Sequence, residues 1–424
     1  MKNILSVLGL LILLAACTQT GGGGQMSLAQ SNKPRNANPS SSAAQQTELV
    51  SGNTAFAFDL YRSLSARQGN LFLSPYSIST ALAMTQAGAR GETLAQMNKA
   101  LHFTLPADAL HPALNALQLA LNKREQNAQD ASKKDFRLRV TNALWGEKTY
   151  TFKADFLDLL AENYGAGLRL VDFLSAPEPS RQAINQWVSD QTEQKIKDLL
   201  PQGTITNLTR LVLTNAIYFN ANWMKPFYPE NTKTGDFSLL DGKKVQAQLM
   251  STSTQLPYAK GSGYQAVELP YEGNKLSMLI VVPDGGKFTD VERSLDPLKL
   301  ESIKKGLGST QVNLQLPRFK FEDAFGLVDA FKALGMQAAF EPGAADLSGM
   351  DGTKNLYISA IEHKAYISVD EKGTEAAAAT AVVVGLTSMP AQTVDFKIDR
   401  PFLFYILDKQ SGALLFMGRV VNPG

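Results

Sequence analysis

The feature of this sequence that most limits how the chain can fold is a run of small residues, GTEAAAATAVVV, from Gly373 to Val384. Every second residue from Thr374 to Val384 is small or β-branched, which suits the inward face of a β-strand. None of this alternating set is charged, so no unpaired charge would be desolvated if the segment entered a sheet. Gly373 supplies backbone freedom for a hinge in front of the run.

The same run also favours a helix, because alanine has the highest helix propensity and Thr374 can cap a first turn. The local sequence leaves both alternatives open. It predicts a segment that is a helix in one state and an interior strand in another, or a helix throughout.

The rest of the chain predicts an α+β fold, because helical patterns dominate early and antiparallel strands late. Apolar stripes at helical spacing predict two helices, at Phe56, Leu60 and Leu64, and at Ile184, Trp187, Val188 and Ile196. Strand-like runs lie at 137–146 and 210–220, and the second is apolar on both faces, as in a central strand. Strand pairs around polar turns are predicted at 269–284 and 402–421.

The N-terminus is typical of an export signal, with Lys2 ahead of an apolar run that ends in Leu14-Ala15-Ala16-Cys17. The end of this run resembles the bacterial lipobox, so we expect a lipoprotein signal peptide at 1–16 and lipidation of Cys17. The alternative is a secretory peptide that merely contains a cysteine. Residues 18–47 are poor in large apolar side chains, and so 17–47 is predicted to be a lipidated cysteine with a flexible tether.

Composition excludes several classes of function. Forty-one basic and 39 acidic residues give a net charge of +2, which offers no electrostatic reason to expect nucleic acid as a partner. A Ser-His-Asp hydrolase has little support, because the chain has only three histidines and no G-x-S-x-G elbow. No H-E-x-x-H, C-x-x-C pair or Walker loop is present, so neither a metal nor a cofactor is expected.

Several longer motifs together resemble the serpin family. They are NLFLSPYSISTALAMTQAGARGET, LTNAIYFNANWMKPF, ISAIEHKAYISVDEKGTEAAAAT and RPFLFYILDKQSGALLFMGRVVNP, and they spread the resemblance over residues 50 to 424. It implies a single domain at 48–424, with three β-sheets, about nine helices and an exposed reactive loop. It also implies a monomeric protease inhibitor with no catalytic residues of its own.

The resemblance further implies how the inhibitor works. A serine protease, or by extension a cysteine protease, attacks the loop and forms a covalent acyl complex, and the loop then inserts into the central sheet. The hinge residues by this resemblance are Glu371, Gly373, Thr374, Glu375, Ala376, Ala377, Ala378 and Ala379. The family's spacing from Glu371 places the reactive bond at Thr387-Ser388, which favours an elastase-like target. A bond one residue earlier would present Leu386 and favour a chymotrypsin-like target.

Five further positions match the serpin residues that gate the central sheet. Ser74, Ser77, Asn215 and His363 match a polar cluster beneath the sheet, and Trp223 matches a tryptophan where insertion begins. Each serine has an alternative role as an ordinary helix cap, and Trp223 as a plain core aromatic. Asn215 lies in an apolar strand and needs a hydrogen-bond partner, for which we expect His363.

The sequence also leaves a rival function and predicts a location for the protein. A non-inhibitory serpin, acting as a binding module or as a protease substrate, is the main rival, although Thr374 and Ala376 to Ala379 do not resist insertion. The expected location is the outer membrane or cell surface, facing the periplasm or the outside, because Thr18 is not the aspartate that retains many lipoproteins in an inner membrane.

Overall fold

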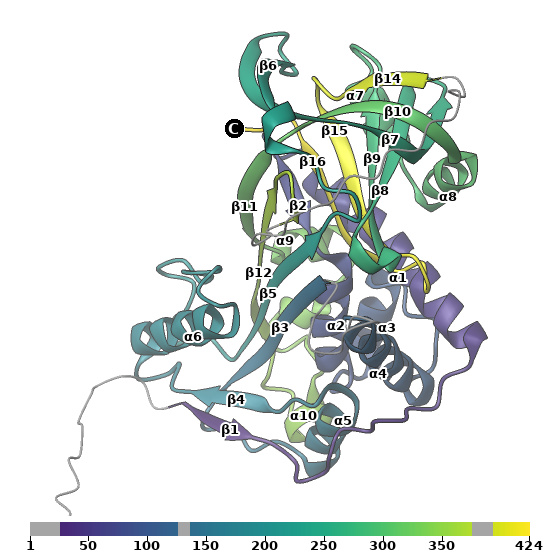
Figure 1. Cartoon of the computed structure of the whole chain (residues 1–424). Coiled ribbons are helices and arrows are strands. Elements are labelled where there is room, and N and C mark those ends of the chain that lie inside the picture. The colour runs from purple at the N-terminus through teal and green to yellow at the C-terminus, as the bar shows by residue number, and fades with distance from the viewer. Residues whose placement is uncertain (1–25, 126–135, 375–392) are drawn as a thin grey trace, which may run out of the picture.

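The computed structural model describes residues 26–125, 136–374 and 393–424. In these residues the chain forms two β-sheets, with most of the helices gathered around the lower part of the molecule as drawn in Figure 1. The α-helices are α1 (Ala43–Leu64), α2 (Pro75–Gln86), α3 (Gly91–Ala100), α4 (Ala107–Arg124), α5 (Ala154–Tyr164), α6 (Pro177–Gln191), α7 (Phe288–Ser294), α8 (Pro297–Gly306), α9 (Val328–Ala333) and α10 (Ser348–Asp351). Short 3-10 turns lie at Pro229–Asn231, Glu272–Asn274 and Ala338–Phe340.

The first sheet has seven strands, and its central strand is the one predicted from its apolar faces. In spatial order the strands are β1 (Ser27–Ala29), β4 (Leu168–Val171), β3 (Phe136–Glu147), β5 (Leu211–Asn222), β13 (Gly373–Thr374), β12 (Ile358–Val369) and β11 (Phe319–Gly326). β5 pairs antiparallel with β3 and parallel with β12. It is buried at every position from Leu211 to Phe219, because both of its faces are covered.

The second sheet contains nine strands, so the described residues form two sheets where the family resemblance implied three. Its strands are β14 (Thr393–Lys397), β10 (Gly308–Pro317), β7 (Lys244–Gly261), β8 (Tyr264–Pro270), β9 (Leu276–Pro283), β15 (Phe402–Asp408), β16 (Leu414–Val420) and β2 (Leu71–Leu73), with β6 (Lys233–Ser238) paired on β7. The long strand β7 pairs with β6 and β10 along most of its length and with β8 at its end. It therefore joins β6, β10 and β8 in one continuous sheet. The strand pairs predicted at 269–284 and 402–421 are confirmed.

The main core lies between the two sheets. Helix α2 is buried along its whole length and packs against β16 of the second sheet and against β3 and β5 of the first. A smaller apolar cluster on the other face of the first sheet is covered by α6, through Ile184 and Val188. Ile196 belongs to this cluster, but it lies five residues after the end of α6 at Gln191, so the last member of the predicted helical stripe is not in the helix.

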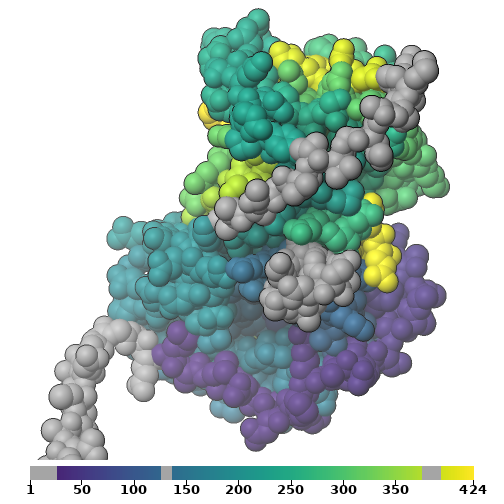
Figure 2. Space-filling view, viewed as in Figure 1, coloured from purple at the N-terminus to yellow at the C-terminus, as the bar shows by residue number. Residues whose placement is uncertain are grey.

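The N-terminal segment corrects the prediction of a flexible tether that reaches residue 47. Residues 26–42 lie against the domain, and Figures 1 and 2 show this part of the chain running along its lower edge from β1 towards α1. β1 adds to the outer edge of the first sheet by pairing with β4, and α1 begins at Ala43 after the capping residue Ser42. The domain therefore begins well before residue 48.

Side-chain hydrogen bonds hold this segment in place. The Arg35 guanidinium donates to Asn115 at 2.9 Å and to Gln118 at 2.8 Å, both on α4. The Asn36 amide donates to the Glu162 carbonyl of α5 at 2.8 Å, and Lys33 pairs with Asp158 of the same helix at 3.0 Å. The segment needs no large apolar side chains because polar contacts and strand pairing fix it, and composition alone does not reveal such contacts.

Cys17 and the rest of residues 1–25 lie outside the described residues. In the part of the chain that the structure describes, none of the helices has the length and apolar character needed to cross a membrane.

Candidate functional site

The candidate site lies where the chain turns back at the end of β12 and enters the first sheet. A tight turn follows Val369, closed by a hydrogen bond from the Asp370 amide to the Gly373 carbonyl at 2.9 Å. Gly373 and Thr374 then form β13, which pairs antiparallel with β5 on one side and with β12 on the other. The first two residues of the predicted run are thus already inside the sheet, in a strand conformation.

Gly373 is required at this turn for a reason that differs from our prediction. We expected it to supply backbone freedom, but a Cβ at this position would lie 2.0 Å from the Ala221 carbonyl oxygen and 2.7 Å from the Asn222 Cα. Both atoms belong to the backbone of β5 and cannot move aside. The absence of a side chain therefore lets the hinge enter beside β5.

Glu371 is held in the turn by two side chains. The Arg318 guanidinium donates to its carboxylate from Nε at 2.7 Å and again from a terminal nitrogen, and the Thr232 hydroxyl donates to the same oxygen. Partial burial alone would raise the pKa of Glu371, but these hydrogen bonds outweigh burial and hold that pKa below its ordinary value. The ionised carboxylate fixes the position from which the loop departs.

An aromatic pair covers the point of entry. The Trp223 ring stacks on the Tyr271 ring with centroids 4.6 Å apart, and its indole nitrogen donates to the Asp370 carbonyl at 3.0 Å. The buried Tyr271 hydroxyl lies 2.9 Å from the Thr374 hydroxyl, so the two form a hydrogen bond. Trp223 is therefore both a core aromatic and a contact of the hinge turn.

Below the entry point, a polar cluster links α2 with three strands. The Asn215 amide nitrogen donates to the Ser77 hydroxyl at 2.5 Å and to the Asn142 amide oxygen, and the Ser77 hydroxyl donates to that Asn142 oxygen at 3.1 Å. The Asn215 amide oxygen accepts from the His363 ring at 2.5 Å, which confirms the predicted pair. β5 and β12 are thus joined by side chains as well as by their backbones.

The two serines have different roles. Ser74 caps α2 by accepting from the Ser77 amide at 3.2 Å, and its hydroxyl donates to the Leu415 carbonyl of the second sheet at 2.7 Å. Ser77 lies within the first turn of α2, so the capping alternative fails for it. The structure therefore brings Ser77, Asn215 and His363 into one network, with Ser74 beside it.

His363 is neutral in this network. Its Nδ1 must carry the proton, because the Asn215 oxygen can only accept, and its Nε2 is buried without a hydrogen-bond partner. Complete burial lowers the pKa of His363 to about 3. The contact between His363 and Asn215 therefore joins two neutral groups, and separating them breaks no ion pair.

Four residues of the site were missed by sequence analysis: Asn142, Thr232, Tyr271 and Arg318. Asn142 could have been found, because β3 and β5 carry the same Thr-Asn-Ala tripeptide, and Asn142 stands opposite Asn215 in the sheet. Thr232, Tyr271 and Arg318 come from distant parts of the chain, and no local pattern marks them. Glu375, Ala376, Ala377, Ala378, Ala379, Leu386, Thr387 and Ser388 lie outside the described residues.

This arrangement fixes the turn before β13 and joins β5 to β12 through side chains. Among its described residues no nucleophile lies beside an activating base, since His363 is hydrogen-bonded to an amide and is buried. Among residues 26–125, 136–374 and 393–424, no group of three or more histidine, cysteine or acidic side chains is placed to hold a metal ion.

Comparison with known proteins supports this description. Residues 51–423 match the family model described as serpin (serine protease inhibitor). An uncharacterized serpin-like protein of Thermococcus kodakarensis is 37% identical over 100% of this chain and 99% of its own length. The human leukocyte elastase inhibitor is 40% identical over 89% of this chain and 100% of its own length. The native structure of the thermophilic serpin tengpin superposes with a TM-score of 0.82 at 28% identity, over 93% of this chain and 99% of tengpin. The chain belongs to the serpin family.

Proposed function

We propose that this protein inhibits serine proteases by inserting its cut reactive loop between β5 and β12 of the first sheet. The observation that carries this proposal is β13, because its two residues already stand between those strands and pair with both. Strand addition to a sheet is a general mode of peptide recognition, and the serpin loop is a standard example of it. Family membership and the similarity to elastase inhibitors support serine protease inhibition in general.

The register of β13 supports insertion of the whole run. Thr374 stands opposite Ala221 of β5 and Val369 of β12, and both of these side chains belong to the main core. A strand continued from Thr374 would therefore direct every second residue, the small and β-branched set, into that core. None of these residues would place a charge there.

The same register assigns a role to the polar cluster. Thr374 pairs with Ala221 of β5 and with Val369 of β12, and both pairings are antiparallel. A strand continued six residues beyond Thr374 would bring Thr380 opposite the residues six positions before these partners. Those residues are Asn215 and His363. The hydrogen bond between Asn215 and His363 would then break. A threonine hydroxyl can both donate and accept, so it can satisfy the two separated groups.

For the target, we propose an elastase-like serine protease that cuts the loop of this protein at Thr387-Ser388. Thr387 offers a small β-branched side chain that suits a shallow primary pocket, and several relatives are leukocyte elastase inhibitors at 38–41% identity. Cleavage one residue earlier would present Leu386 and favour a chymotrypsin-like protease.

We also propose that the protein is exported and anchored through a lipidated Cys17 at an outer membrane or cell surface. The described structure begins at Met26, and so only residues 18–25 would separate the lipid from the domain. Eight extended residues span at most about 29 Å. The edge of the first sheet formed by β1 and β4 would therefore lie close to the membrane.

The direct test is incubation of the purified protein with elastase and chymotrypsin, followed by denaturing electrophoresis and mass spectrometry. We expect a covalent complex that survives SDS, with cleavage after Thr387. A protease whose catalytic serine is replaced by alanine is the control and should give no such complex. Cleaved protein with fully active protease, across a panel of serine and cysteine proteases, would instead establish the non-inhibitory role.

A further inference from the structure

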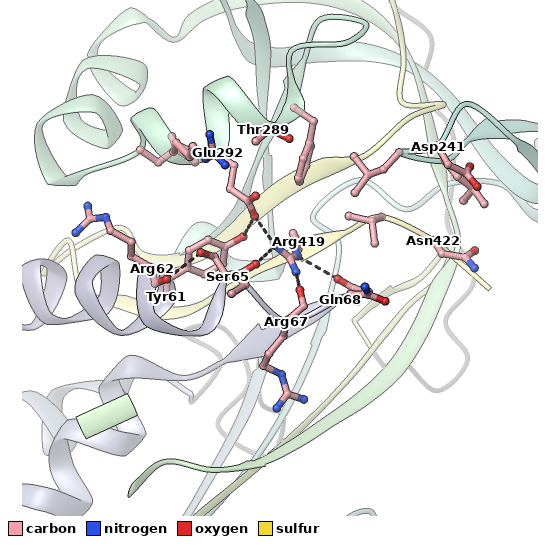
Figure 3. Close-up of a pocket in the computed structure, with 18 of the residues that line it drawn as sticks. Tyr61, Arg62, Ser65, Arg67, Gln68, Asp241, Thr289, Glu292, Arg419 and Asn422 are labelled. Carbon is pink, nitrogen blue, oxygen red and sulfur yellow. Dashed lines mark hydrogen bonds and ion pairs between the residues drawn. The ribbon is translucent and has the colours of Figure 1, made fainter. Parts of the chain in front are cut away.

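A large cavity lies away from the hinge, and the proposed mechanism does not use it. It has a volume of about 990 Å³, is open to solvent on one side, and is lined by the C-terminal end of α1, by α7, by the turn after β6 and by the chain end after β16. Figure 3 shows side chains from these elements converging on it. Its size is at the upper end of the range for small-molecule sites.

The floor of the cavity is a closed polar network. The buried Arg419 guanidinium donates to the Glu292 carboxylate and the Ser65 carbonyl at 2.9 Å, to the Gly69 carbonyl at 3.0 Å, and to the Arg67 carbonyl. The Tyr61 hydroxyl donates to Glu292 at 2.6 Å. These partners neutralise Glu292 and occupy Arg419, so the floor offers no uncompensated charge to a ligand.

The walls of the cavity are apolar. Three buried apolar side chains line it: Phe58 of α1, Phe288 of α7, and Leu295 directly after α7. Leu240 lines it from the turn after β6 and is 57% exposed. An alkyl chain in contact with Leu240 would remove this exposed apolar surface from water.

The rim of the cavity carries positive charge, and one arginine there has no acidic partner. Arg62 pairs with Asp59 at 2.9 Å, and Arg67 pairs with Asp323 at 3.2 Å. Arg293 of α7 lines the same cavity and is exposed, and within the described ranges it forms no ion pair. The rim's one carboxylate, Asp241, is paired with Lys243 at 2.9 Å.

We propose that this cavity binds an amphipathic carboxylate, a fatty acid or a similar alkyl acid, with its head group on Arg293 and its chain against Leu240 and the buried apolar wall. The charge of the rim favours an anion, because Asp241 is already paired with Lys243 and Arg293 is available to bind a negative group. A guanidinium binds a carboxylate through two parallel hydrogen bonds. The apolar wall selects an alkyl chain over a purely polar anion.

The test is isothermal titration calorimetry of the purified protein with decanoate, and with decyltrimethylammonium as a probe of equal chain length and opposite charge. We expect saturable one-site binding of decanoate, with decyltrimethylammonium at least about tenfold weaker. Arg293→Gln should weaken decanoate binding about tenfold, because it removes the charged head-group contact. Leu240→Asp should weaken the binding of both probes.

The matched control is Arg137→Gln, which removes an exposed arginine of β3 that does not line the cavity. It should leave decanoate binding unchanged, and melting curves of all variants confirm that they are folded. Binding without saturation, equal affinity for both probes, or decanoate binding that is unchanged in both Arg293→Gln and Leu240→Asp would overturn the proposal. No protease takes part, so the outcome is independent of the inhibitory function.

Discussion

The two sheets of this molecule differ in what holds their centres together. At the centre of the first sheet, β5 and β12 are joined by a network of amide, hydroxyl and imidazole groups, and their seam is already opened at one end by β13. At the centre of the second sheet, β9, β15 and β16 are buried at every position, and their side chains are almost entirely apolar. Under the proposed mechanism, the first sheet would exchange strand partners, whereas the second would stay fixed.

The physical reason lies in how the two kinds of contact respond to separation. A hydrogen-bonding group loses little free energy when one hydrogen-bond partner is replaced by another. An incoming strand can therefore supply new partners for the groups whose bonds it breaks. Packed aromatic rings, such as Phe72 against Phe404 and Phe416, have no such substitute and leave a cavity when parted. Polar residues inside the first sheet therefore fit the proposal that this sheet opens to admit the loop.

The largest expected effect comes from blocking entry to the first sheet. Thr374→Arg places a charge at a fully buried position between β5 and β12, where desolvation costs several kcal/mol. We expect inhibition to fall by at least about 100-fold and the protein to be cut as a substrate, measured as the moles of inhibitor needed per mole of protease. Glu375→Arg, on the opposite face of the predicted strand, is the matched control and should remain an inhibitor. Normal inhibition by Thr374→Arg would contradict insertion.

A cavity in the second sheet should affect stability without affecting insertion. Phe404→Ala removes a fully buried ring that packs against Phe72 and should lower the free energy of unfolding by about 3–5 kcal/mol. Because this sheet does not rearrange, the intact and loop-cut proteins should lose the same amount, as measured by urea denaturation of each. A loss confined to one form would show that the second sheet also moves.

Acid should lower the stability of the folded protein through the buried His363 between β5 and β12. Since burial holds the pKa of His363 at about 3, the unfolded chain binds a proton between about pH 6.5 and 3 that the folded protein does not. Stability is therefore lost as the pH falls through this window, at about 1.4 kcal/mol per pH unit for this one group. His111, with a pKa lowered to about 4 by burial, adds a similar loss.

Replacing His363 isolates its share of this pH dependence. In His363→Gln, which keeps an N–H donor for Asn215, the slope of stability against pH between 6 and 4 should decrease by about 1.4 kcal/mol per unit. His102→Gln, at a half-exposed ring bonded to Asp59, is the control. An unchanged slope in His363→Gln would mean that the ring is not held neutral in the folded protein.

The smallest effect is expected at the top of the seam. Tyr271→Phe removes the hydrogen bond to Thr374 and should cost about 1 kcal/mol. Since Thr374 is already inside the sheet, the intact and cut proteins should lose this amount equally in urea denaturation. A loss seen only in the cut protein would place Thr374 outside the sheet before cleavage.

Much of the fold could be predicted from local patterns. β5 and the pair β15 and β16 follow from apolar runs, because burial on both faces leaves a continuous apolar signature. The pair of Asn215 and His363 followed from the rule that a buried amide needs a partner, together with the family resemblance. The predicted link between the two residues was therefore confirmed by their 2.5 Å contact.

The features that were not predicted depend on contacts between distant segments. Residues 26–42 looked like a tether because they lack apolar bulk, but Arg35 and Asn36 fix them through hydrogen bonds to α4 and α5. The need for glycine at 373 arises from the backbone of β5, and Tyr271 meets Thr374 across 103 residues of sequence. Local composition does not indicate such contacts.

The central claim is that the chain gains stability when the loop becomes an interior strand of the first sheet. It is tested most directly by comparing the melting temperatures of the intact protein and of the protein cut once in the loop. About ten inserted residues, bonded on both sides at about 1 kcal/mol net per bond, should raise the melting temperature by more than about 10 °C. Equal melting temperatures for the two forms would contradict the account.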